Sequence, residues 1–237
     1  MTVIEGMAPN LSAKRAGAEV SIYFLRGDVP IAVFPDERAE AVSKFFPLIM
    51  GSWELCRCVI ETNLENINLL VHPAMALLNM GYYDQAEAAG DTVSFYGTGN
   101  TIHAGRLTEA LDAKRPPVCD AFGVRFRSPV EHIHRLYGGA GDTVHEAVKQ
   151  SPVYKNSGAL PPRIWQSWMA DDVPLAHVPF VLLAEAARVP VLLHRGFVDI
   201  VDALLGSNSW QDELTLERLG LEGMSPEKIR NYVETGR

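Results

Sequence analysis

The stretch ETNLENINLLVHPAMALLNMG, residues 61–81, has the length and apolar content of a buried helix, yet it carries four asparagines and a histidine. Pro73 follows His72 directly. Because a proline inside a helix removes a backbone donor and crowds the preceding turn, we expect one helix over residues 62–80 with a kink near Pro73. Helical spacing places Asn68 and His72, four residues apart, on one face of that helix.

The pair Asn68 and His72 has two interpretations. An imidazole can donate or accept a proton near neutral pH, and an amide beside it can orient a carbonyl or carboxylate ligand. Alternatively, the histidine is a hydrogen-bonded residue of a helical core. Spacing alone does not separate the two, because such pairs are common on helices.

Hydrophobic patterning divides the chain into a β-rich segment, residues 1–60, and a mostly helical segment, residues 61–237. Strands are predicted over residues 19–25, 29–34 and 54–60, the first two as a hairpin or as adjacent strands. A helix is predicted over residues 36–46. A lone hairpin and helix cannot form a core, so these strands need partners. The predicted fold class is α+β, mostly α.

The helical segment contains several further helices and two predicted loops. A Gly-rich loop is expected over residues 83–101, and a long Pro- and Gly-containing loop over residues 151–173; loops of that length are often functional. Ser128 and Ser225 each precede a proline, which is the pattern of an N-cap followed by Pro at the first helical position. The helices are expected over residues 101–115, 128–138, 143–150, 176–188, 190–205 and from 226 onward.

Charge and cysteine content exclude several classes of protein. The net charge of −8 over 237 residues argues against nucleic-acid binding, which needs clustered Lys and Arg. Three cysteines do not suggest a disulfide framework, and a reducing cytoplasm is the simplest location. The N-terminus has no apolar signal-peptide core, and no apolar run is long enough to span a membrane.

Asp171 and Asp172 stand between the predicted long loop and a buried helix. Either could be an N-cap ahead of Val173-Pro174. Alternatively, one of them is a carboxylate that fixes the tautomer of a histidine and stabilises its charged form. One aspartate can serve each role.

No strong metal or phosphate motif is present. His132 and His134 would point to different faces of a helix, whereas helical zinc ligands prefer a spacing of four. A zinc hydrolase that uses these two residues and His145 is therefore the last of our hypotheses, and we expect no metal. The Cys-Arg-Cys stretch at residues 56–58 lacks zinc-ligand spacing, and no Gly-x-Gly-x-x-Gly occurs.

An ordered series of segments resembles the octopine/nopaline (opine) dehydrogenase family. The most specific one is VIETNLENINLLVHPAMALLNMG, which is similar to the family form LeTslxNxNpxxHPxxxLLNxG. The others are VIEGMAPNLSAKRAGAEVSIYFLRGDVPIAVFP, FYGTGNTIHAGRLTEALDAKR, DDVPLAHVPFVLLAEAARVPV and TLERLGLEGMSPEKIRNYVETG. Together they cover nearly the whole chain. The first resembles the last part of a nucleotide-binding domain. The rest resemble a helical domain like the C-terminal domain of 6-phosphogluconate dehydrogenase.

The resemblance implies an activity and a role for each matching residue. Members of the family condense an amino acid with a 2-oxo acid and reduce the resulting imine with NADH or NADPH. His72 would be the acid/base residue, Asp172 would pair with it, and Asn68 would help to hold the substrate.

The sequence departs from the family in two places. The Gly-rich turn of a Rossmann domain is missing, so we expect weak dinucleotide binding by this chain alone. Either the chain is a fragment or a separate domain, or the missing Rossmann half is another polypeptide; the expected protein partner is that Rossmann domain or a second copy in a homo-oligomer. Ser167 stands where the family often has an arginine, and Arg163 is our candidate for its carboxylate-binding role. The alternative function is a non-catalytic binding or dimerisation module.

Overall fold

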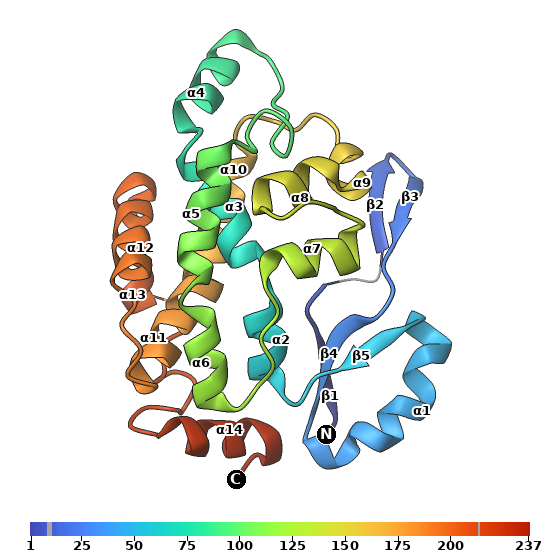
Figure 1. Ribbon diagram of the computed structural model, residues 1–237, viewed down its shortest axis with the longest axis vertical. Helices are drawn as coiled ribbons and strands as arrows, with labels where there is room; N and C mark the ends of the chain where they lie inside the picture. Colours follow the sequence, from blue (N-terminus) through green and yellow to red (C-terminus); the bar gives the residue numbers. More distant parts are fainter. Residues whose placement is uncertain (9–10, 213) are drawn as a thin grey trace.

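The computed structural model describes residues 1–8, 11–212 and 214–237, and its fold is α+β, mostly α (Figure 1). Short strands occupy the N-terminal part of the chain, drawn in blue, and helices form the rest. The last strand ends at Leu55 and helix α2 begins at Val59. The division of the chain into domains at residues 60 and 61 stays a prediction.

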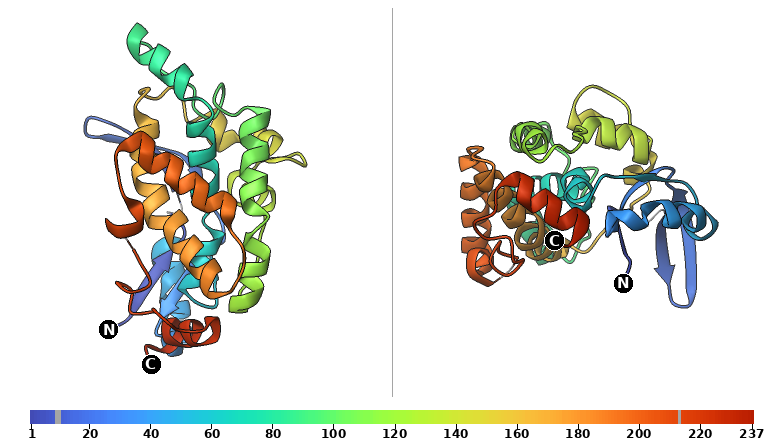
Figure 2. Two further views of the ribbon diagram at one scale, coloured as in Figure 1. Left: turned by 90° about the vertical axis from the view of Figure 1, so that its left-hand side faces the viewer. Right: turned by 90° about the horizontal axis from the view of Figure 1, so that it is seen from below.

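Five strands form two separate sheets. In the first, β4 (Val29–Phe34) lies between β1 (Val3–Gly6), antiparallel, and β5 (Trp53–Leu55), parallel. In the second, β2 (Leu11–Ala16) pairs with β3 (Glu19–Leu25). This hairpin projects from the body of the molecule in both views of Figure 2.

The predicted strands at 19–25 and 29–34 are present, but the prediction that they pair with each other is wrong. β3 pairs with β2 because a two-residue turn, with Gly17 at φ 62°, joins Ala16 to Glu19. Positive φ at such a turn matches the twist of a hairpin. The third predicted strand, at 54–60, ends after Leu55.

The segment 62–80 is not one kinked helix. It contains the end of α2 (Val59–Glu65), then α3 (Asn68–Leu77) and the start of α4 (Met80–Ala89). Pro73 lies inside α3, and asparagines mark the breaks. The Asn66 side chain accepts a hydrogen bond from the backbone N–H of Asn68, at 3.1 Å, and Asn79 donates to the Met75 carbonyl at 2.7 Å. Local bonds of this kind compete with the helix and end it.

Helices also occupy much of the two segments predicted as loops. α4 extends into residues 83–89, and α9 and α10 lie within residues 151–173. Asp171 and Asp172 end α10, and although Asp172 directly precedes the π-helical turn at residues 173–177, its side chain makes no capping hydrogen bond there. Ser128 and Ser225 do cap their helices.

The remaining helical elements are the 3₁₀ turn Asp36–Arg38, α1 (Ala39–Met50), α5 (Ile102–Asp112), α6 (Arg115–Phe122), α7 (Pro129–Tyr137), α8 (Val144–Gln150), α9 (Pro152–Lys155), α10 (Ile164–Asp172), the π-helical turn Val173–His177, α11 (Val178–Ala186), α12 (Leu192–Leu205), α13 (Ser209–Asp212) and α14 (Pro226–Thr235).

Helix α3 lies at the centre of the larger core. It packs against α5 and α10, and every residue from Leu69 to Ala76 is buried. Figures 1 and 2 show it enclosed by the other helices. A second core cluster joins α2, α6, α11 and α14. Because α3 is buried on all sides, its one ionisable side chain, His72, needs partners. Within the described residues, no helix is long and apolar enough to cross a membrane.

Candidate functional site

His72 lies in the middle of α3 and is 8% exposed. Its Nδ1 lies 2.9 Å from Oδ2 of Asp172, the last residue of α10. The packing of α3 against α10 therefore brings together two side chains that are a hundred residues apart in the sequence. An aspartate in this position accepts the Nδ1–H, so Nε2 carries the lone pair.

The other nitrogen of His72 also has a partner. Nε2 lies 2.7 Å from the hydroxyl of Tyr96, which follows Val93 and Phe95 in the connection between α4 and α5. Since Nε2 is the acceptor, the tyrosine hydroxyl donates. The imidazole also stacks on Trp168 of α10, with ring centroids 4.4 Å apart and planes at 14°. Asp172, His72 and Tyr96 thus form a continuous chain of hydrogen bonds.

This chain of hydrogen bonds ends at a small pocket of about 160 Å³. Asn68 lines the pocket together with His72, as expected from their helical spacing. The other lining residues are Ser12, Arg26, Tyr96, Tyr137, Val153, Tyr154 and Ser157. Burial raises the pKa of the Tyr137 and Tyr154 hydroxyls, so both stay neutral donors near pH 7. We call this cavity the His72 pocket.

Arg26 supplies the positively charged side chain in the lining of the His72 pocket, and it is not among the site residues predicted from the sequence. Its guanidinium donates to the Leu11 carbonyl at 2.8 Å and to Ser12 Oγ at 2.6 Å, and it lies 4.8 Å from the Tyr137 ring centroid. A fork-shaped guanidinium suits carboxylate binding. Arg26 opens the Arg-Gly-Asp stretch at residues 26–28, which by sequence indicates only a turn, and nothing local relates residue 26 to residue 72.

The structure does not bring Arg163 together with His72. Its guanidinium forms an ion pair with Glu87 of α4, its side chain is 70% exposed, and it does not line the His72 pocket. Arg163 directly precedes the first residue of α10, whereas Asp172 is the last residue of that helix. Because Asp172 is the end that contacts His72, Arg163 lies at the opposite end of α10. We therefore assign the carboxylate-binding role to Arg26 as a candidate.

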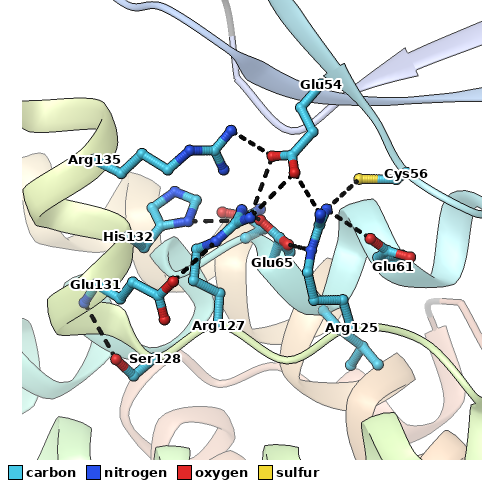
Figure 3. A network of polar contacts seen from close by, with 12 residues as sticks. Glu54, Cys56, Glu61, Glu65, Arg125, Arg127, Ser128, Glu131, His132 and Arg135 are labelled. Atoms are coloured by element: carbon cyan, nitrogen blue, oxygen red, sulfur yellow. Dashed lines mark hydrogen bonds and ion pairs between the residues drawn. The ribbon is translucent and has the colours of Figure 1, made fainter.

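A network of acidic and basic side chains anchors the sheet to the helices (Figure 3). Glu54 of β5 pairs with arginines from three positions, and Glu65 of α2 pairs with two of them. Figure 3 shows the Arg125 and Arg127 guanidinium groups between the carboxylates of Glu54 and Glu65, and Arg135 beside Glu54. The arginines are Arg125, Arg127 and Arg135. The network fixes β5, and with it the sheet, relative to α2 and α7.

The histidines of the zinc hypothesis do not converge on one point. His132 is fully buried beside the arginine network, and burial, aided by Arg115, lowers its pKa to about 3. His134 is exposed. Among the described residues, no group of three or more His, Cys, Asp or Glu side chains is arranged to hold a metal ion.

The strand-to-helix connection after β4 does not fit the pyrophosphate of a dinucleotide. The strand-to-helix connection after β4 has Pro35 and no glycine, and the helical turn that follows begins with Asp36 and Glu37. Two carboxylates at that helix start would repel an anion, whereas a dinucleotide-binding turn is Gly-rich and presents backbone N–H groups.

Comparison with known proteins agrees with the fold and with the segment that carries the site. The model of the NAD/NADP octopine/nopaline dehydrogenase family, alpha-helical domain, matches residues 55–205. An opine dehydrogenase of Arthrobacter sp. (strain 1C) is 28% identical over 216 residues, which cover 91% of this chain and 59% of that protein. The chain thus spans about three fifths of the length of this relative.

Solved structures of octopine dehydrogenase share the fold. One, in complex with NADH and L-arginine, has a TM-score of 0.64, and another, with NADH and agmatine, has a TM-score of 0.66. Each is 14% identical and matches all of this chain and 65% of that chain. His72, Tyr96 and Asp172 fall within the segment that the family model matches, whereas Arg26 falls outside it.

Proposed function

Because this chain belongs to the NAD/NADP octopine/nopaline dehydrogenase family, we propose that it binds the substrates and transfers the protons in an opine dehydrogenase. The proposed reaction is the reductive condensation of an amino acid with a 2-oxo acid. The observation that carries the proposal is the buried contact between His72 and Asp172, at 2.9 Å, beside a pocket lined by Arg26 and Asn68.

The proposed role of His72 is to move protons during condensation. The amine nitrogen adds to the carbonyl carbon and releases a proton, which the neutral imidazole accepts. His72 returns this proton to the oxygen, which gives the carbinolamine. When the neutral imine forms, the same nitrogen releases its second proton, and His72 passes it to the hydroxyl, which leaves as water; the imidazole is thereby regenerated. A positioned acid/base group of this kind contributes roughly 10²–10⁴-fold to a rate.

The proposed role of Asp172 is to hold His72 in the productive tautomer. A carboxylate that accepts the Nδ1–H keeps the lone pair on Nε2 and stabilises the imidazolium that forms when Nε2 takes a proton. The Asp172 side chain is 17% exposed and that of His72 is 10% exposed. Screening by water is therefore limited, which strengthens this electrostatic support.

The proposed role of Arg26 and Asn68 is to bind substrate carboxylates. Both proposed substrates carry a carboxylate next to the reacting centre, and both residues line the pocket that contains His72. A guanidinium supplies charge and a forked geometry, while the Asn68 amide supplies neutral N–H donors.

NADH or NADPH would supply the hydride that reduces the imine. The acidic turn after β4 does not suit its pyrophosphate. We propose that a Rossmann-type unit outside the described residues holds the cofactor. Octopine dehydrogenase structures have been solved with NADH together with L-arginine, agmatine or pyruvate, which is consistent with this class of cofactor and substrate.

The proposal is tested by assembling the chain with a Rossmann-type partner and following NADH absorbance with pyruvate and a mixture of amino acids. We expect turnover, and we expect His72→Ala to lower it by roughly 10²–10⁴-fold. His134→Ala is the matched control, because His134 is exposed on α7. If His72→Ala turns over at the wild-type rate, the assignment is wrong.

A further inference from the structure

A second cavity adjoins the His72 pocket. It has a volume of about 360 Å³ and lies between residues 94–100, α8 and α9. It shares Tyr96, Tyr154 and Ser157 with the His72 pocket, and the rings of the two tyrosines lie 4.4 Å apart. A small molecule at the His72 pocket is therefore next to this second cavity. We call it the lysine pocket, after Lys149 and Lys155 in its lining.

The lysine pocket is basic in an acidic protein. Lys149 comes from the end of α8 and Lys155 from the end of α9. No acidic residue lines the cavity, and no described carboxylate forms an ion pair with either ammonium group. The chain as a whole has a net charge of −8. Two lysines without carboxylate partners around one acid-free cavity favour an anionic ligand.

Polar atoms in the wall of the lysine pocket also lack partners. Asn100 is 4% exposed, and its amide N–H donates to the His145 backbone carbonyl at 2.9 Å. Its Oδ1 and the Nδ1 of His145 are buried and have no hydrogen-bond partner among the described residues. Because buried polar groups are nearly always hydrogen-bonded, the Asn100 Oδ1 acceptor needs an N–H or O–H of a ligand or water, and an Nδ1–H of His145 can donate to an anion.

We propose that the lysine pocket binds a second carboxylate, so that one of the two substrates is a dicarboxylic acid. This inference rests on the proposed function of the His72 pocket. Arg26 and Asn68 hold the carboxylate beside the reacting carbon, and Lys149 and Lys155 hold the one at the far end. The second carboxylate comes from the side chain of an acidic amino acid or from a dicarboxylic 2-oxo acid. A guanidinium or ammonium at that end meets two like charges, so the pocket selects against arginine and agmatine.

Binding to the chain itself tests this inference without turnover. We would titrate the protein with L-glutamate, L-alanine, L-arginine, 2-oxoglutarate and pyruvate, and follow the backbone amides of Gly97, Ser157 and Gly158 by NMR. We expect at least one dicarboxylate to bind about tenfold more tightly than its monocarboxylate counterpart, because a charged hydrogen bond contributes that much. L-Glutamate against L-alanine tests the amino acid as source, and 2-oxoglutarate against pyruvate tests the oxo acid.

Substitution of the lysines locates the effect. Lys149→Met with Lys155→Met should remove the tenfold preference and leave the affinity for L-alanine and pyruvate unchanged. Lys228→Met, on the exposed surface of α14, is the matched control for loss of one positive charge. In the double variant Lys149→Glu and Lys155→Glu, agmatine should bind more tightly than the dicarboxylates.

Two results would overturn the inference: dicarboxylates that bind no more tightly than monocarboxylates, or a preference that survives removal of both lysines. The outcome is separable from that of the proposed function. Loss of turnover in His72→Ala together with unchanged selectivity in the lysine variants would leave the His72 assignment standing and end this one.

Discussion

At the scale of single residues, His72 illustrates why a buried ionisable group needs neighbours on every side. Asp172 bonds one ring nitrogen, Tyr96 bonds the other, and Trp168 stacks on the ring face. The imidazole therefore has no free nitrogen to offer to a substrate. Any proton that reaches the pocket from Nε2 passes through the hydroxyl of Tyr96, or Tyr96 moves away first.

Tyr96→Phe distinguishes those two paths. If the hydroxyl relays the proton, turnover in the assembled enzyme should fall by roughly 10²-fold with little change in KM, because only the proton path is removed. Tyr232→Phe, on the exposed surface of α14, is the control. Wild-type turnover in Tyr96→Phe would mean that Tyr96 moves aside and His72 meets the substrate directly. The ¹⁵N shift of His72 Nε2 should change in either case, because a 2.7 Å hydrogen bond is lost.

At the scale of elements, the arginine network determines how the sheet sits on the helices. Arg127 follows α6, is only 7% exposed, and reaches both Glu65 of α2, at 2.5 Å, and Glu54 of β5, at 3.2 Å. Burial raises the pKa of Glu65 above its ordinary value, and the neighbouring arginines offset part of that rise. Removing the Arg127 charge leaves the buried Glu65 carboxylate with Arg125 as its remaining arginine partner among the described residues, and lost charge compensation at a buried carboxylate is costly.

Arg127→Met should therefore lower the free energy of unfolding by about 3–5 kcal/mol. Arg163→Met is the matched control, because Arg163 forms an exposed ion pair with Glu87, and such pairs contribute at most about 1 kcal/mol. Urea denaturation followed by circular dichroism measures both. Equal losses in the two variants would contradict the view that burial makes the network essential.

At the scale of the whole molecule, buried histidines make stability depend on pH. His177 and His194 lie in the centre of the helical body with their Nδ1 atoms 3.2 Å apart, and His194 Nε2 donates to the Leu111 carbonyl at 2.9 Å. Burial lowers the pKa of His177 to about 3 and that of His194 to about 4. The unfolded chain takes up these protons near pH 6.5, whereas the folded protein does not. The stability contribution is thus present above pH 6.5 and is lost as pH falls toward 4.

His177→Leu should reduce the pH dependence of stability. Each buried neutral histidine contributes a slope of roughly 1.4 kcal/mol per pH unit between its folded and unfolded pKa values. The free energy of unfolding, measured in urea at pH 7, 6 and 5, should fall less steeply in His177→Leu than in the wild type. His134→Gln, at an exposed position, should keep the wild-type slope. Identical slopes in all three proteins would contradict the assignment.

The sequence was sufficient for features that depend on neighbours in the chain. Strand-forming residues bounded by turn residues located β3 and β4, serine–proline pairs located the starts of α7 and α14, and the spacing of Asn68 and His72 predicted their shared face. The family resemblance, carried by an ordered series of segments, is confirmed by the family model. Each of these signals is local, because helix periodicity, capping and strand alternation act over a few residues.

Only the tertiary structure determined which distant side chains meet. The helices within residues 151–173 and the position of Arg26, and not Arg163, at the His72 pocket both depend on packing between segments far apart in the chain. Propensity does not report such contacts, and burial overrides it in α10, where Trp165 and Met169 enter the core. The proposed site exists because α3 is buried in the helical body: the sequence supplied the imidazole, and the fold supplied its carboxylate, its hydroxyl and its pocket.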